Sequence, residues 1–284
     1  YALKFRFNYL TSTNLSLPDK IPLVTVHEYS LSNGAPIANT VSPTLNGFVS
    51  PISATLIIFS FAKLGITKAQ LSVLKIIYFN YWENYSKKVR KWIGEDVLKS
   101  WLDNLSNKNS AEAINLLGNF YRFKQHDLTN QSYSEAKNLS DEEFAKLLED
   151  PDYIQKSEEL GEQICSCIKK AFDCYRKASE LNFALAQFNV YRIYDSYPNP
   201  LESYVKIDAL KYLENAAKNG LPNAQFVWAK ELLQKDKLKQ AIPFIAASAK
   251  APKKNWVRDE GWYGDQKAAK KWIKKFHKID EVEP

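Results

Sequence analysis

Small and large apolar residues alternate at helical spacing through the second half of the chain, and the arrangement repeats. In each copy an alanine is followed by a large apolar residue four positions later and by glycine, tyrosine or alanine at the next position. Tyrosine or leucine stands eight positions after the alanine. The copies are Ala113-Leu117-Gly118-Tyr121, Ala186-Val190-Tyr191-Tyr194 and Ala224-Trp228-Ala229-Leu232. The second copy starts 73 residues after the first, close to two periods, and the third starts 38 residues after the second. Repeats of this length are typical of stacked helical hairpins, each too small to bury its apolar face alone.

A second pattern predicts the other helix of each hairpin. It runs Ala171-x2-Cys174-Tyr175-x2-Ala178-Ser179, returns 38 residues later as Ala209-x2-Tyr212-Leu213-x2-Ala216-Ala217, and degenerates to Ala241-x2-Phe244-Ile245-x2-Ser248-Ala249. Small residues let helices approach closely, and tyrosines fill the space between hairpins. Gly220 followed by Pro222 predicts a helix end and a restart. We therefore predict an all-α fold, an α/α superhelical solenoid of helical hairpins with an irregular N-terminal segment.

The chain is divided accordingly into four predicted parts. Residues 1–50 form an irregular segment with a short strand or hairpin near Pro22–Val26, either a cap on the array or a tail that orders with a partner. Residues 51–95 are a helical N-terminal part or cap. Residues 96–250 are the repeats, with an acidic insertion at about 124–160 in which Ser140 and Glu143 indicate a capping box. Residues 251–284 are a C-terminal capping helix.

Charge is unevenly distributed along the chain. The net charge is +7, but residues 134–162 carry ten acidic side chains against three lysines, and residues 229–278 carry fourteen basic against five acidic ones. Such a bipolar distribution could steer a charged partner. The alternative is that these charges solvate exposed helix faces.

Few residues suggest catalysis or metal binding. The three cysteines, Cys165, Cys167 and Cys174, are expected to be structural thiols, and the three histidines lack metal-ligand spacing. No phosphate-binding or hydrolase motif is present, so we expect no enzymatic activity, cofactor or metal. A catalytic site assembled by the N-terminal segment is the remaining alternative. The apolar stretch Ile52–Phe61 is too short to span a bilayer, so no transmembrane segment is expected.

Residues Asp208 to Phe226 (DALKYLENAAKNGLPNAQF) closely resemble a Sel-1-like repeat, a relative of the tetratricopeptide repeats. In that family an Ala-Ala-x2-Gly turn ends helix B, and an Ala-Gln-aromatic step opens the next helix A. Ala186-Gln187-Phe188 carries the same step. Asn182 replaces the turn glycine, Tyr191 stands where a small residue is preferred, and Pro243 lies in the last helix B. The resemblance covers about residues 96–250 outside the acidic insertion.

The resemblance implies a non-enzymatic scaffold that binds another protein along a concave face lined by helix A. The outward-pointing candidates there are Gln187, Arg192, Gln225 and Lys230, and the alternative is that they are ordinary solvated residues. Many such proteins are bacterial and exported, and some neutralise a toxin as immunity proteins. A protein-binding scaffold is the leading hypothesis, with an inhibitor of this kind as one variant and an adaptor of a bacterial envelope complex as the alternative.

The basic helix near the C-terminus suggests a further alternative, binding to an anionic surface. It carries Lys267, Lys270, Lys271, Lys274 and Lys275 beside Trp272. Such helices can lie on membranes or contact phosphates, but more often they cap the last repeat with their lysines in water. We expect a protein partner, no nucleic acid, and a monomer.

The chain begins at Tyr1 and contains no methionine. Its native start is therefore missing, either because it was trimmed or because an export signal was removed. We expect a periplasmic or exported location slightly in preference to the cytoplasm.

Overall fold

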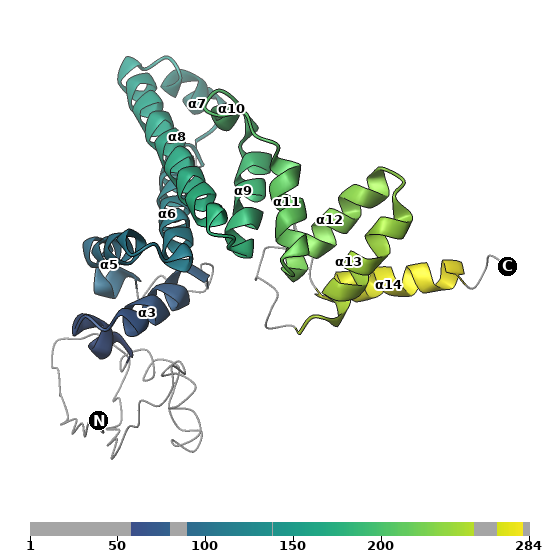
Figure 1. The fold of residues 1–284 in the computed structure, drawn as a ribbon. Helices are drawn as coiled ribbons and strands as arrows, with labels where there is room; N and C mark the ends of the chain where they lie inside the picture. The colour runs from purple at the N-terminus through teal and green to yellow at the C-terminus, as the bar shows by residue number, and fades with distance from the viewer. Residues whose placement is uncertain (1–57, 80–89, 138, 253–265, 281–284) are drawn as a thin grey trace, which may run out of the picture. The chain divides into compact units, whose positions relative to one another are not determined.

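The computed structural model describes residues 58–79, 90–137, 139–252 and 266–280 (Figure 1). The prediction for residues 1–50 lies outside these ranges. Within them every regular element is an α-helix, which confirms the all-α prediction. The helices are α3 (Thr67–Phe79), α5 (Glu95–Asn107), α6 (Ala111–Ala136), α7 (Asp141–Leu147), α8 (Pro151–Glu180), α9 (Ala184–Ser196), α10 (Pro198–Glu202), α11 (Ala209–Lys218), α12 (Pro222–Gln234), α13 (Leu238–Lys250) and α14 (Gln266–Asp280).

The contacts divide the chain into two compact units, residues 1–74 and 75–284. In the first unit, residues 58–63 are helical and turn at Gly65, whose φ is 81°, into the start of α3. Phe59 and Val73 are buried there, and the Gln70 amide donates a hydrogen bond to the Ala62 carbonyl at 3.2 Å. The assignment of residues 51–95 as a helical N-terminal part or cap stays a prediction, because residues 51–57 and 80–89 lie outside the described ranges.

In the second unit the helices stack in the order of the sequence (Figure 1). α5 packs on α6, α6 on α8, α8 on α9, α9 on α11, α11 on α12, α12 on α13 and α13 on α14. Phe188, Leu213, Ala216, Ala224 and Val227 form one of the resulting cores between successive helices. Because each helix mainly contacts its neighbours in sequence, the fold is a solenoid of helical hairpins.

The turns between hairpins keep the register of the repeat. Asn109, Asn182 and Gly220 have φ values of 55°, 58° and 83°, and each lies four residues before the first alanine of a repeat copy. Left-handed backbone of this kind suits glycine, and asparagine is the side-chain residue that adopts it most readily. Asn182 therefore performs the turn that Gly220 performs one repeat later. Pro222 begins α12, as predicted.

Close contact between α6 and α8 depends on a residue without a side chain. A Cβ atom placed on Gly118 would lie 2.4 Å from Cε1 of Tyr175, well inside van der Waals contact. Tyr175 is buried, and its hydroxyl donates a hydrogen bond to Asn119 Oδ1 at 2.8 Å. Gly118 therefore sets how closely these two helices approach, as its place in the repeat predicts.

The acidic insertion lengthens the repeat helices instead of interrupting them. α6 continues to Ala136 and α8 begins at Pro151, so they span 26 and 30 residues, and the short α7 joins them. The predicted capping box is present: the Ser140 hydroxyl accepts from the Glu143 amide, and the Glu143 carboxylate accepts from the Ser140 amide. The repeat pattern was predicted to lapse between residues 124 and 160. The chain is nevertheless helical over most of this range, and only the apolar spacing is lost, because these parts of the helices lie outside the core.

The last helix closes the array. Ala269 of α14 is buried, and Trp272 packs edge-on against Phe226 with ring centroids 5.5 Å apart. α14 thus packs on the preceding helices, and the assignment of residues 251–284 as a cap stays a prediction. Among the described residues, no helix combines the length and apolar character needed to cross a membrane.

Candidate functional site

The two glutamines predicted on the binding face take part in the turns between repeats. Gln187 is only 5% exposed; its amide donates to Asn182 Oδ1 at 3.2 Å and its carbonyl oxygen accepts from Asn219 at 2.8 Å. Gln225 is half-buried and donates to the Ala217 carbonyl at 3.3 Å, near the end of α11. The expectation that Gln187 points outward is therefore wrong, because it links two successive turns. Gln225 satisfies a backbone carbonyl at a helix end.

The two cations predicted on the same face lie over aromatic rings. The Arg192 guanidinium is 5.7 Å from the ring centroid of Phe188, and the Lys230 ammonium is 4.8 Å from that of Phe226. Both residues are half-buried, and both stand four residues after their aromatic partner, one repeat apart. Each stem is thus held along its helix while part of the side chain stays in contact with solvent. Their role in binding stays a prediction.

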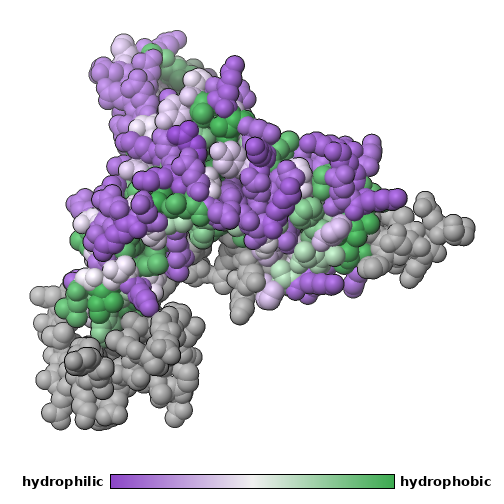
Figure 2. All heavy atoms as spheres, in the orientation of Figure 1, coloured by the Kyte–Doolittle hydropathy of each residue, from purple (hydrophilic) through white to green (hydrophobic). Residues whose placement is uncertain are grey.

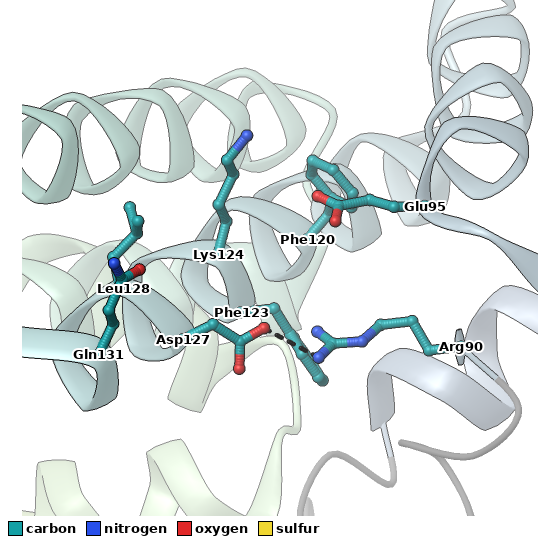
Figure 3. A pocket seen from close by; sticks show the side chains of 8 residues that line it. All are labelled: Arg90, Glu95, Phe120, Phe123, Lys124, Asp127, Leu128 and Gln131. Atoms are coloured by element: carbon teal, nitrogen blue, oxygen red, sulfur yellow. Dashed lines mark hydrogen bonds and ion pairs between the residues drawn. The ribbon is translucent and has the colours of Figure 1, made fainter. Parts of the chain in front are cut away.

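A pocket of about 200 Å³ lies beside the middle and the second half of α6 (Figure 3). Arg90 and Asp127 point toward each other there, with Nη2 and Oδ2 2.8 Å apart, and the guanidinium lies 4.9 Å from the Phe123 ring centroid. Glu95 and Lys124 also line it. Because it holds two cations and two anions, the pocket offers no strong preference for a charged ligand.

Behind this pocket, the phenol of Tyr78 is buried against two rings of α6. Its ring meets Phe120 and Phe123 edge-on, with centroids 6.2 and 5.1 Å away. Burial raises the pKa of Tyr78 above its ordinary value, an effect that Arg90 partly offsets. The phenol is therefore neutral at physiological pH and contributes packing to the pocket wall.

The end of the α6–α8 hairpin carries exposed apolar residues that the sequence analysis did not single out. Their exposed fractions range from 37% to 67%, and they are Tyr133, Leu139, Phe144, Leu148 and Ile154. We call these five residues and the acidic side chains of residues 141–152 the α7 surface. In Figure 2 apolar patches show among the hydrophilic atoms around α7 and the nearby end of α8. A signal was available, because Phe144 and Leu148 stand at helical spacing in an otherwise acidic stretch.

The basic helix presents lysines around its packed apolar side. Lys267, Lys270, Lys271 and Lys274 are exposed, and Ile273 joins Trp272 against the preceding helices. Lys275 lies among the residues whose side chains the structure does not describe. The apolar side of α14 is therefore already covered by the array.

Reactive groups are scattered and shielded in the described part of the chain. Burial raises the pKa of the Cys174 thiol to about 12 and also raises that of Cys167, and all three cysteines are free. His126 Nδ1 lies 2.9 Å from the Asn130 amide. No cluster of possible metal ligands forms among the residues described. The raised pKa values keep both thiols protonated and weakly nucleophilic.

No protein-family model matches this chain, and a search of curated proteins found no match to it. The resemblance to Sel-1-like repeats accordingly stays a prediction.

Proposed function

We propose that the protein is a non-enzymatic repeat scaffold that binds another protein. The observation that supports this most is the in-register stacking of hairpins that mainly contact their neighbours in sequence. Such arrays display side chains from many turns on one continuous surface. The residues that recur at the repeat spacing pack the helices against one another. The buried alanines, the turn asparagines and Gly118 all have such packing roles here.

Within this class we favour a dedicated inhibitor, of the kind that neutralises a toxin, over an adaptor. The lengthened α6–α8 hairpin supports this choice, because it belongs to one repeat and the α9–α11 and α12–α13 hairpins are not lengthened in this way. A unique projection suits one specific partner, whereas an adaptor would use equivalent surfaces of several repeats.

The experiment that tests the proposal is affinity capture from a native lysate, with the full chain as bait and mass spectrometry as the readout. We expect one dominant stoichiometric protein. Many envelope or machinery components would favour the adaptor. Recovery of lipid or nucleic acid without protein would contradict the proposal and favour the basic helix as the binding element.

A pair of charge reversals tests whether helices α9 and α12 contribute. Arg192→Glu with Lys230→Glu should weaken binding of the captured protein if the predicted face is used. The matched control is Lys211→Glu with Lys239→Glu, which changes the net charge equally at exposed positions of α11 and α13. Equal affinity of both double variants would exclude the α9–α12 face.

A further inference from the structure

The α7 helix is ordered without burying any of its side chains. None of its seven residues is buried, although it contains Phe144 and is followed by Leu148, which are 38% and 50% exposed. A helix of this length is marginal in water by itself, and here the capping box and its short connections hold it. The chain thus maintains a short helix whose apolar residues stay partly exposed to solvent.

Neighbouring apolar residues enlarge this exposed apolar group. Tyr133, one turn before the end of α6, is 67% exposed, and Ile154, in the first turn of α8, is 42% exposed. Because α6 and α8 pack along each other and α7 joins their ends, these residues gather at one end of the hairpin. Scattered exposed apolar residues need no explanation, but a group of large ones at one end is typical of an interaction site.

The charge around these apolar residues is strongly negative and largely uncompensated. Residues 134–162 carry a net charge of −7. Asp141, Glu142 and Asp152 are exposed, and none of the ion pairs between described residues involves them. The α7 surface would therefore repel phosphates and anionic lipid, and it would attract cationic groups.

We infer that the α7 surface is the docking site for a basic amphipathic segment of another protein, with large apolar residues flanked by lysine or arginine. The inference rests on the proposed protein-binding function and assigns the partner's chemistry. Apolar side chains of the segment cover Phe144, Leu148 and Tyr133, while its cations meet the surrounding carboxylates. The chain's own basic helix does not fit this role for a second copy, because its apolar side is packed on Phe226 and Ala249.

The test uses the full chain and a fluorescently labelled amphipathic peptide of leucine and lysine, with a leucine–glutamate peptide of the same pattern as the charge control. We expect the basic peptide alone to bind, with an affinity that falls as salt is raised. Phe144→Ser with Leu148→Ser should weaken this binding roughly tenfold or more, as removal of a central apolar contact usually does. Because neither residue is buried, helicity should be unchanged.

A matched variant, Val97→Ser with Leu238→Ser, removes two residues of similar exposure from α5 and α13. It should bind the peptide as the unmodified chain does. Equal weakening by both double variants, or equal binding of the acidic peptide, would overturn the inference.

Binding of the natural partner to the variant chain tests this inference separately from the proposed function. A captured protein that binds the Phe144→Ser/Leu148→Ser chain with full affinity would overturn the α7 site while leaving the scaffold function in place. A different outcome is that no protein is captured but the variant still loses peptide binding. That result would contradict the proposed function, while the preference of the α7 surface for cationic ligands would remain supported.

Discussion

Replacement of Gly118 by alanine probes the packing that the repeat pattern implies. The added Cβ would lie 2.4 Å from Cε1 and 2.6 Å from Cδ1 of Tyr175, whereas carbon atoms in contact prefer about 3.5–4.0 Å. The tyrosine ring would have to move by roughly 1 Å to restore that separation. It is 4% exposed, and its hydroxyl is bonded to Asn119, so it has little room to do so.

Opposing contributions determine the size of the effect. Overpacking a core costs about 1–3 kcal/mol, and a weakened hydrogen bond from Tyr175 to Asn119 adds about 1 kcal/mol. Alanine is the better helix former by about 1 kcal/mol, which offsets part of this loss. We therefore expect Gly118→Ala to lower the free energy of unfolding by about 1–3 kcal/mol.

Gly161 provides the matched control within the same pair of long helices. A Cβ at Gly161, inside α8, would meet no atom within 4 Å. Gly161→Ala should therefore raise stability by about 0.5–1 kcal/mol through helix propensity alone. The two substitutions are chemically identical and are expected to have opposite signs.

Urea unfolding followed by circular dichroism at 222 nm measures both variants. Since repeat arrays can unfold in segments, hydrogen exchange of α6 and α8 should accompany it and report local protection. Combining Gly118→Ala with Tyr175→Leu should cost less than the sum of the single changes, because the smaller side chain relieves the clash. A Gly118→Ala chain as stable as Gly161→Ala, or strict additivity with Tyr175→Leu, would refute the packing argument.

Three further predictions concern the cap, a thiol and α7. Trp272→Ala should lower the free energy of unfolding by about 1–3 kcal/mol, because its ring packs on Phe226, and a thermal midpoint equal to that of the unmodified chain would contradict the capping role. Burial raises the pKa of Cys174 from 9.0 to about 12, so the stability gained from its neutral thiol is present below pH 9 and is lost as pH rises toward 12. Across that pH window, the urea midpoint should fall more steeply with pH for the unmodified chain than for Cys174→Ala. Equal dependence of the midpoint on pH in both chains would exclude this thiol as a cause of the loss of stability. Ser140→Ala should reduce amide protection in α7 but leave the global midpoint unchanged, because α7 buries no side chain; a lowered global midpoint would show that α7 supports the core.

The parts of the fold that follow from local chemistry were predictable. Gly220 and Pro222 end one helix and start the next through backbone preferences that any context preserves. Asn182 appeared as a departure from the turn pattern, yet it adopts the same left-handed conformation, since asparagine tolerates it. The small residue at Gly118 likewise indicated a close helix approach before its partner was known.

The parts that depend on distant contacts were not predictable. Gln187 shares the alanine–glutamine–aromatic step with Gln225, but it is buried because Asn182 and Asn219 converge on it from separate turns. The pocket at Arg90 depends on the ion pair with Asp127, which lies 37 residues away. Helices α6 and α8 extend beyond the residues that show an apolar pattern. Their far ends lie outside the core, so the sequence has no apolar periodicity there from which these helix ends could be predicted.

The most direct test of the central claim is a binding measurement between the purified chain and the purified protein that affinity capture identifies. Titration calorimetry reports both stoichiometry and affinity without other components that could bridge the two. We predict a one-to-one complex whose affinity falls as salt is raised, and falls in Phe144→Ser/Leu148→Ser but not in Val97→Ser/Leu238→Ser. Absence of binding between the purified components would contradict the account of this chain as a protein-binding scaffold.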